Sequence, residues 1–298
     1  MVGGMNKTPV SVVVLTFNEE ANIRFCLESV RDLTDEIFIV DSFSTDKTLE
    51  IAQEYTDKIY QHPWTHYAGQ RQWALANLPF AHEWLFFLDA DERLTAPLRQ
   101  EIGRVAREET KNPAIGGYYV PRKFFFLGRQ LRWGGCQGGL KELRLCHRQY
   151  LTIGERAGHE IYIIQGKTGT LKERLVHEDK KPLSAWIDRH NHYATINGAY
   201  LFSLRHGQAG PIEGLSRGAS DRRLYWKEVF RWKVWNRLPI GLRPAIYFLH
   251  NYFLRLGFLD GKAGFLYIFL HDFWYQLLID AKYLELCRTK IGGGGELE

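Results

Sequence analysis

The sequence predicts an α/β fold, a mostly parallel sheet flanked by helices, and three observations lead to it. Apolar runs rich in β-branched or aromatic residues occupy positions 10–16, 36–41 and 84–88, and each is typical of a strand buried on both faces. These runs alternate with segments whose apolar residues recur at helical spacing. The connections between them are short, which favours parallel strands with helices packed on the sheet.

The elements can be placed in order along the first half of the chain. We expect strands at 10–16, 36–41, 58–61 and 84–88, and helices around 23–30, 47–55, 68–78 and 96–109. Asn18 is a plausible N-cap for the first helix, and Asp46 or Thr45 for the second. Further strands are expected at 116–120 and 142–146, and the pattern becomes helical from Ser184 onward.

Length and composition allow two domains. The 298 residues carry a net charge of +5, and aromatic residues make up 14% of the chain, gathered toward its C-terminal end. We expect one domain at 8–180 and a helical region at 181–291. The four cysteines show no metal-ligand spacing, so reduced thiols in the cytoplasm are expected.

Carboxylates follow the predicted strands at the points where the strands end. Asp41 ends the second strand, and Asp89 and Asp91 follow the fourth. The carboxyl ends of parallel strands share one sheet edge, where ligands bind. Asp89 and Asp91 can hold one ligand if the chain turns at Ala90. Two such carboxylates suit a divalent cation shared with phosphate oxygens, and the alternative is a solvated turn before the next helix.

Two common nucleotide-binding motifs are missing from the sequence. No Gly-x-Gly-x-x-Gly follows the first strand, which disfavours a dinucleotide site. No Gly-x-x-x-x-Gly-Lys-Ser/Thr loop occurs either, which disfavours a P-loop NTPase.

Three motifs instead resemble family 2 glycosyltransferases of the GT-A fold. They are Leu-Thr-Phe-Asn-Glu-Glu at 15–20, Val-Asp-Ser-Phe-Ser-Thr-Asp-Lys-Thr at 40–48 and Asp-Ala-Asp-Glu at 89–92. The similarity looks closest to the lipopolysaccharide-core β-1,4-glucosyltransferase group. It covers roughly residues 8–180 and, more loosely, 257–264.

The resemblance implies a site for a nucleotide sugar. Asp41 matches the acid that accepts a hydrogen bond from the N3–H of uracil, which a carboxylate can do and which cytosine cannot satisfy. Arg71 resembles the basic residue beside the diphosphate, where a guanidinium binds two oxygens. The other implied contacts to the sugar nucleotide come from Thr16, Phe17, Glu19, Asp89, Ala90 and Asp91. Glu19 alone could equally serve the dipole of the first helix.

The resemblance also implies a cation and a base. Asp91 would hold Mg²⁺ or Mn²⁺, and His177 is either a further ligand or a hydrogen-bonded structural histidine. Glu160 falls near the position of the catalytic base. The glycine-rich segment 128–135 contains Trp133, which predicts either a mobile loop that stacks on a sugar or an ordinary hairpin.

The last third of the chain has the composition of an interfacial helix. Cations between Arg222 and Arg243 alternate with aromatic residues, a pattern that suits an anionic membrane surface. The apolar stretch 263–279 is interrupted by His271 and Asp272, so a membrane span is not expected. A buried helical subdomain or a dimer contact is the alternative, and nucleic acid is not an expected partner.

Together these features predict an inverting, metal-dependent glycosyltransferase at the cytoplasmic face of the inner (plasma) membrane, peripheral or monotopic. It would move a sugar, a hexose by our expectation, from a UDP-sugar to a saccharide or lipid-linked acceptor in envelope glycan biosynthesis. Two alternatives remain at this point. One is a nucleotidyltransferase with a related sheet, and the other is a non-catalytic scaffold at the membrane.

Overall fold

The structure is a computed structural model that describes residues 7–109, 114–135, 141–156, 159–208, 226, 229–230 and 234–291. The chain divides into two compact units. One consists of Met1–Gln130 and Gly138–Lys180, and the other of Leu131–Gln137 and Lys181–Glu298. The second unit therefore includes a segment, Leu131–Gln137, that the sequence assigned to the first domain. The division into domains at 8–180 and 181–291 stays a prediction.

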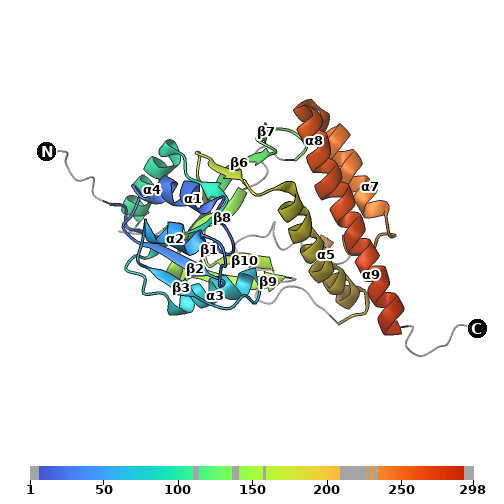
Figure 1. Ribbon diagram of the computed structural model, residues 1–298, viewed down its shortest axis with the longest axis horizontal. Helices are drawn as coiled ribbons and strands as arrows, with labels where there is room; N and C mark the ends of the chain where they lie inside the picture. The colour runs from blue at the N-terminus through green and yellow to red at the C-terminus, as the bar shows by residue number, and fades with distance from the viewer. Residues whose placement is uncertain are drawn as a thin grey trace, which may run out of the picture. The chain divides into compact units, whose positions relative to one another are not determined.

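The first unit is built on one mixed sheet (Figure 1). Its strands are β1 (Val10–Thr16), β2 (Ile37–Asp41), β3 (Ile59–Gln61), β4 (Trp84–Asp89), β5 (Glu92–Arg93), β6 (Gly117–Phe126), β7 (Arg129–Leu131), β8 (Lys141–His147), β11 (Thr168–Thr170) and β12 (Leu175–Glu178). The order is β3-β2-β1-β4-β8-β6-β12-β5, with β7 and β11 also paired to β6. The strands β3, β2, β1 and β4 are parallel, as predicted. In contrast, β8 runs antiparallel to both of its neighbours.

The register of β1 aligns the ends of three strands. Thr16 pairs with Asp41 of β2, and Leu15 pairs with Asp89 of β4. The two predicted acids therefore emerge at the same edge of the sheet. Ala90 is buried in the turn that follows Asp89, and the chain then forms the short strand β5.

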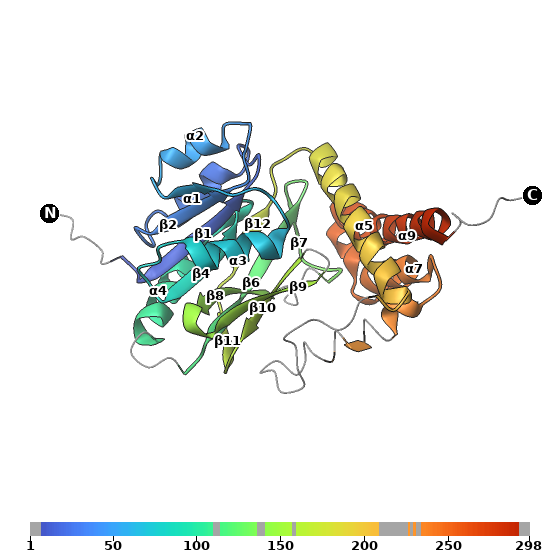
Figure 2. The same cartoon turned by 90° about the horizontal axis from the view of Figure 1, so that it is seen from below.

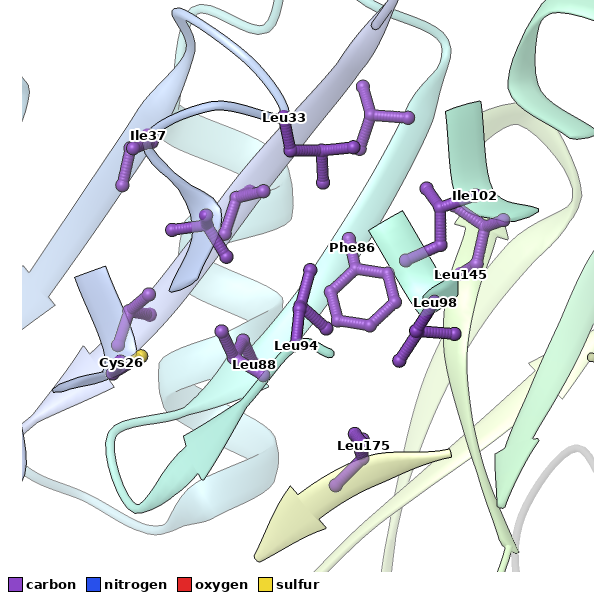
Figure 3. Close-up of a cluster of buried hydrophobic side chains, with 14 of the residues drawn as sticks. Cys26, Leu33, Ile37, Phe86, Leu88, Leu94, Leu98, Ile102, Leu145 and Leu175 are labelled. Atoms are coloured by element: carbon purple, nitrogen blue, oxygen red, sulfur yellow. The ribbon is translucent and has the colours of Figure 1, made fainter. Parts of the chain in front are cut away.

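Alternate residues of each buried strand enter different core clusters. In β4, for example, Phe86 and Leu88 belong to one cluster and Leu85 and Phe87 to the other, as the period of two requires. The first cluster is completed by α1 (Ile23–Val30), α2 (Thr48–Gln53) and α4 (Ala96–Glu109), and Figure 3 shows side chains of this cluster, among them Phe86, Leu98 and Leu145, close together. The second is covered by α3 (Tyr67–Asn77) and by a separate antiparallel ribbon of β9 (Leu151–Arg156) and β10 (His159–Ile164), which follows the 3₁₀ turn η1 (Arg148–Tyr150).

The expected cap at Asn18 is wrong. Helix α1 begins at Ile23 with Asn22 before it, and that position makes no side-chain cap. Asn18 has a positive φ of 51°, and its Oδ1 accepts a hydrogen bond from Thr45 N at 2.8 Å. The side chain therefore joins two loops instead of starting a helix. Asp46 does accept from Thr48 N, at the start of α2.

The second unit is helical. It contains α5 (Leu183–Arg205), α7 (Leu242–Leu249), α8 (Gly261–Ile268) and α9 (Tyr275–Ile291), with 3₁₀ turns η2 (Trp235–Arg237) and η4 (Gly257–Asp260). Two π-helical segments, η3 (His250–Leu254) and η5 (Phe269–Trp274), complete it. Figure 1 shows α8 and α9 as one continuous rod, and α5 packs on α9 through a small apolar cluster.

Buried polar groups are paired inside this helical unit. Arg243 is 3% exposed and pairs with Asp280, so the expectation of Arg243 as a surface cation is wrong. Asp272, which interrupts the apolar stretch, is also buried and accepts from Asn251 Nδ2 at 2.7 Å. Among the described residues, no helix combines the length and the apolar character that crossing a membrane requires.

The helical unit nonetheless exposes many large apolar side chains. Most of them lie on α7, α8 and the segments between: Leu242, Ile246, Leu249, Phe253, Leu254, Leu256, Phe258, Leu259, Phe265 and Leu266 are each at least 38% exposed. Arg237, which lies shortly before Leu242 in the sequence, is also exposed. The other cations of the predicted basic run, Arg222, Arg223, Lys227, Arg231 and Lys233, lie outside the described residues.

Candidate active site

Asp41, one of the predicted donor-site residues, lies in a dense network of hydrogen bonds. Its side chain is fully buried and accepts hydrogen bonds from Thr16 Oγ1 at 2.9 Å, from Ser44 N at 2.9 Å and from Ser44 Oγ at 2.5 Å. A fourth and longer bond, 3.3 Å, comes from Gln61 Nε2. A carboxylate offers about four acceptor positions, so in this state all of them are engaged. A base that bonded to Asp41 would replace the weakest partner, Gln61.

The loops after β1 and β2 are joined by backbone and side-chain hydrogen bonds. Asn18 N donates to Ser44 Oγ at 2.9 Å, and Glu19 N donates to Thr48 Oγ1 at 2.7 Å. Phe17 in the first loop is 54% exposed, which leaves its ring accessible. Phe43 in the second is 51% exposed and has a positive φ of 61°, an uncommon conformation for a bulky residue.

The Glu19 side chain is held by Asn22, which is buried. Asn22 Nδ2 donates to Glu19 Oε2 at 2.8 Å and to Asp179 Oδ1 at 2.9 Å. Asn22 Oδ1 accepts from Lys180 N at 2.8 Å. One amide thus ties the first loop to the segment that follows β12.

Two buried arginines converge on Asp89. Arg71 Nη2 lies 2.5 Å from Oδ1, and Arg144 Nη2 lies 2.5 Å from Oδ2. Burial by itself would raise the pKa of the Asp89 carboxyl, but the adjacent charges of Arg144 and Arg71 outweigh it and hold the pKa well below its usual range. Asp89 is therefore ionised at neutral pH at this sheet edge.

Arg71 also reaches the other side of the site. Its Nε donates to Glu160 Oε1 at 3.2 Å, and the guanidinium lies against the rings of Phe87 and Tyr162. Glu160 comes from β10, in the ribbon that covers one face of the sheet. The arginine thus links Asp89 to Glu160 while its own side chain is completely buried.

Arg144 stands at the centre of an acidic group. Oxygens of Asp89, Glu92 and Glu142 lie within 4.8 Å of one another, an arrangement that by itself resembles a metal site. However, Arg144 Nη2 is 2.5, 2.8 and 2.7 Å from these three carboxylates. Arg71 also pairs with Asp89, and Arg122 pairs with Glu142, so three guanidinium groups face the three carboxylates. We conclude that arginines offset the negative charge that would otherwise attract a cation here.

Asp91 and His177 lie together beside that cluster. His177 Nε2 is 3.6 Å from Asp91 Oδ2, and its Nδ1 is 3.6 Å from Glu92 Oε1. The backbone positions them, because His177 of β12 is paired with Glu92 of β5 and Glu178 N donates to Asp91 O. Burial lowers the pKa of His177, but the Asp91 and Glu92 carboxylates raise it by more, so the net pKa lies above its ordinary value.

Comparison with known proteins identifies the family. Residues 11–164 match the family model described as Glycosyl transferase family 2. The chain belongs to this family. It is 29% identical over 283 residues to the lipopolysaccharide core biosynthesis glycosyltransferase LpsC of Rhizobium meliloti (strain 1021), covering 89% of this chain and 90% of LpsC.

Shorter and weaker similarities to other proteins are also found. An uncharacterized glycosyltransferase, RT0209, of Rickettsia typhi is 39% identical over 93 residues, 31% of each chain. Among solved structures, S. aureus TarS 1-349 aligns over 93% of this chain and 91% of its own, with a TM-score of 0.48 and 14% identity.

The structure gathers most of the predicted site residues of this glycosyltransferase into two groups. Thr16 and Asp41 form one pair, and Arg71, Asp89 and Glu160 form a connected chain with Asp91 and His177 nearby. Sequence reasoning missed Arg144, Glu92, Glu142 and Asn22. A signal for Arg144 existed, because an arginine between Leu143 and Leu145 in an apolar strand must find a carboxylate partner when buried.

Proposed function

We propose that this glycosyltransferase transfers a hexose from a UDP-sugar to a saccharide or lipid-linked acceptor, with inversion at the anomeric carbon. The observation that supports it best is the chain Glu160–Arg71–Asp89. It ties a carboxylate from the β9–β10 ribbon to the acids at the carboxyl edge of β4. A transferase needs a proton acceptor on one side of the donor and charge stabilisation on the other, and this chain connects groups suited to both tasks.

The donor pocket that we propose lies over the loops after β1 and β2. The exposed ring of Phe17 packs against uracil, and Asp41 accepts its N3–H in exchange for the long bond to Gln61. Thr16 and Glu19 complete the nucleoside contacts. This pocket selects uracil over cytosine, because Asp41 requires a donor hydrogen at the base.

Buried guanidinium groups support a diphosphate beside Asp89. Arg71 Nη1, Arg144 Nε and Arg144 Nη1 are buried and have no hydrogen-bond partner among the residues that the structure describes. Buried donors of this kind normally find an acceptor. Phosphate oxygens are suitable acceptors for guanidinium groups, and Asp89 with Ala90 would orient the sugar next to them.

Asp91 and His177 fit a divalent cation. Their 3.6 Å separation allows both atoms to reach one ion at about 2.1 Å. Mg²⁺ or Mn²⁺ would neutralise charge on the departing diphosphate. The raised pKa of His177 means that its proton must leave before it can act as a ligand.

Glu160 is the base in the proposed reaction. It accepts the proton of the acceptor hydroxyl as that oxygen attacks the anomeric carbon, and the bond from this carbon to the UDP oxygen breaks. Arg71 orients Glu160 through the 3.2 Å bond and donates no proton itself. UDP leaves with the electron pair of the broken bond.

The biological setting is proposed from LpsC, whose name places it in lipopolysaccharide core biosynthesis and which aligns over most of both chains. We assign this chain to envelope glycan synthesis at the cytoplasmic face of the inner membrane. The exposed apolar side chains of the helical unit support attachment to a lipid surface. The two compact units would then be a catalytic domain at 8–180 and a membrane-associating domain at 181–291.

A donor assay tests this proposal. The protein is incubated with a panel of UDP-sugars, Mg²⁺ or Mn²⁺ and a membrane lipid extract, and released UDP and glycosylated lipid are measured. The wild type should release UDP. Release of pyrophosphate would identify a nucleotidyltransferase, and no turnover with any donor would favour the scaffold.

Two variants assign the roles of the acids. Asp91→Ala should abolish turnover while uridine still binds, whereas Glu160→Gln should keep UDP binding and lower transfer by about 10² or more. Asp57→Ala, an exposed aspartate in the same unit, is the matched control and should match the wild type. Full activity of Asp91→Ala would refute the metal assignment. Normal transfer with weakened donor affinity in Glu160→Gln would make Glu160 a binding residue.

A further inference from the structure

A small pocket lies within the helical unit, and the activity proposed above leaves it unassigned. It has a volume of about 300 Å³ and is lined by Trp133, Gly134 and Gly135 on one side and by Leu254, Arg255 and Leu256 on the other. The first three residues follow β7, and the last three connect η3 to η4. Both segments belong to the second compact unit.

The Trp133 side of the pocket is rigidly built. Asp260 is 4% exposed, and its carboxylate accepts hydrogen bonds from Arg132 N and, at 2.7 Å, from Trp133 N. Gly134 N donates to Arg255 O, and a Cβ on Gly134 would lie 2.6 Å from Ile268 Cδ1. A buried carboxylate and a glycine contact thus fix this segment. The start of segment 128–135 does form the predicted hairpin, because β7 pairs with β6 across the turn at Leu127 and Gly128, and the part from Arg132 onward is held by Asp260.

The opposite side has an unusual backbone. It follows the π-helical segment η3, and π turns often occur at functional sites. Leu256 has a positive φ of 57°, which is strained for a leucine. Leu254 is 77% exposed, more than any other large apolar side chain among the described residues. A folded chain maintains such features where a ligand or partner compensates for them.

Arg255 gives the pocket a positive charge. Its side chain is exposed, and its guanidinium has no hydrogen-bond or ion-pair partner among the residues that the structure describes. A Cβ on Gly135 would lie 3.2 Å from Arg255 Nη1, so the guanidinium lies against the glycine side of the pocket. Two buried acids of this unit already have partners, because Asp260 accepts from Arg132 N and Trp133 N, and Asp272 accepts from Asn251 Nδ2. The pocket therefore combines one uncompensated cation, an indole and exposed leucines.

We propose that this pocket binds a phosphate group carried by the membrane-borne saccharide acceptor. Arg255 pairs with the phosphate, since a guanidinium matches two phosphate oxygens. Trp133 contacts the adjoining sugar, and Leu254 and Leu256 contact the hydrocarbon part of the lipid. This assignment rests on the proposed function, because it assumes that the acceptor is linked to a lipid. It means that the helical unit recognises the headgroup of the acceptor.

Vesicle binding tests the assignment. The full-length protein is sedimented with phosphatidylcholine vesicles that contain either phosphatidic acid, a phosphate monoester, or phosphatidylserine at matched surface charge. The wild type should prefer phosphatidic acid. Arg255→Gln should weaken binding to phosphatidic acid by about tenfold and remove the preference. Arg288→Gln, an exposed arginine of α9, is the matched control and should retain the preference.

Several outcomes would overturn the proposal. Equal binding of Arg255→Gln and the wild type excludes Arg255 as the anion ligand. Efficient competition by millimolar inorganic phosphate would show that the pocket takes free phosphate instead of a headgroup. Trp133→Ala provides a second variant, which should also lose the preference while its thermal unfolding stays close to that of the wild type.

A separate readout keeps this test independent of the donor reaction. UDP binding, measured by calorimetry, should be the same for Arg255→Gln and the wild type, because the pocket contains none of the proposed donor residues. If the wild type prefers phosphatidic acid but binds no UDP, the proposed UDP-sugar donor is refuted, and the assignment of the pocket as a phosphate site is retained. If UDP binds normally and no preference appears, only the pocket assignment fails.

Discussion

At the scale of single residues, two buried arginines determine the electrostatics of the candidate site. Arg144 is 1% exposed and contacts three carboxylates, while Arg71 is fully buried and joins Asp89 to Glu160. Removing a guanidinium from water is unfavourable, and the nearby carboxylates compensate for it only while each pair remains intact. Removing one partner should therefore leave uncompensated charge in the interior.

Arg144→Met should destabilise the protein by about 3 kcal/mol, because it removes one buried cation from three carboxylates and leaves the buried Glu92 with no arginine partner, while Asp89 keeps Arg71 and Glu142 keeps Arg122. Urea unfolding followed by tryptophan fluorescence measures the change. Arg148→Met is the matched control. Arg148 pairs with Glu83 at the surface, both side chains are more than 40% exposed, and its loss should cost less than about 1 kcal/mol. Equal losses in the two variants would contradict the role of Arg144.

Acid should weaken the wild type through the same cluster. The pKa of Asp89 is lowered in the folded state, so its contribution to stability is complete above its ordinary pKa of about 4 and is lost as the pH falls further. In Arg144→Met this lowering should shrink, and the decline in stability below about pH 4 should become shallower. If the stability of the wild type and of Arg144→Met falls equally steeply below pH 4, Arg144 does not lower the pKa of Asp89.

His177 should make metal binding depend on pH. Its raised pKa stabilises the metal-free fold below about pH 6.5, and this contribution is lost as the pH rises through the folded-state pKa. A metal ligand must be neutral, so Mn²⁺ affinity in the presence of UDP should increase with pH over that range and release a proton. Calorimetry in buffers of different ionisation enthalpy measures both. His177→Asn should bind Mn²⁺ more weakly and with less pH dependence, and an unchanged pH profile would exclude His177 as a ligand.

At the scale of elements, close packing between helices decides where glycine is required. Figure 2 shows α5 beside α9. At Gly198 of α5, a Cβ would lie 3.0 Å from Lys282 Cβ and 3.4 Å from Ile279 O. A larger side chain at this position must push the two helices apart. The adjacent Ala199 on α5 is exposed and should accept the same change freely.

Gly198→Leu should therefore destabilise the helical unit by about 2 kcal/mol, the usual effect of overpacking, although leucine favours a helix more than glycine does. Thermal and urea unfolding provide the measurement. Ala199→Leu is the control and should lie within about 0.5 kcal/mol of the wild type. A stabilised Gly198→Leu would mean that α5 and α9 do not pack closely in solution.

At the scale of the whole molecule, chemistry and surface character are divided between the two units. The first contains the acids and arginines of the candidate site. The second buries its ion pairs, such as Arg243 with Asp280, and exposes a continuous series of apolar side chains on α7, α8 and the segments between. Exposed apolar area of this extent is uncommon on a monomer that contacts only water.

Attachment to membranes should accordingly survive high salt. Flotation with anionic vesicles should weaken as salt screens the net charge of +5, but an apolar remainder should persist. Leu249→Gln combined with Phe253→Gln should remove about 2 kcal/mol of that remainder, more than tenfold in affinity. Leu277→Gln with Leu284→Gln, exposed residues of α9, is the control. If both double variants float as well as the wild type, the apolar residues of α7 and η3 do not contact lipid.

The sequence alone determined the features that depend on local pattern. The runs at 10–16 and 84–88 became β1 and β4 almost to the residue, and helix 96–109 became α4. Because the carboxyl ends of parallel strands share one edge, the grouping of Asp41 and Asp89 was also predictable. The motifs at the ends of these strands were sufficient to identify the family.

Tertiary structure decided the contacts made between distant segments. Arg144 reaches Asp89 only because β8 inserts antiparallel beside β4, and no periodicity in the sequence specifies that pairing. Arg71 meets Glu160 across 89 residues of chain, through a ribbon that packs on α3. The segment with Trp133 joins the helical unit because a buried carboxylate 127 residues away, on Asp260, accepts its backbone N–H. Each of these contacts depends on burial and hydrogen-bond satisfaction in the folded interior, which no local window of sequence contains.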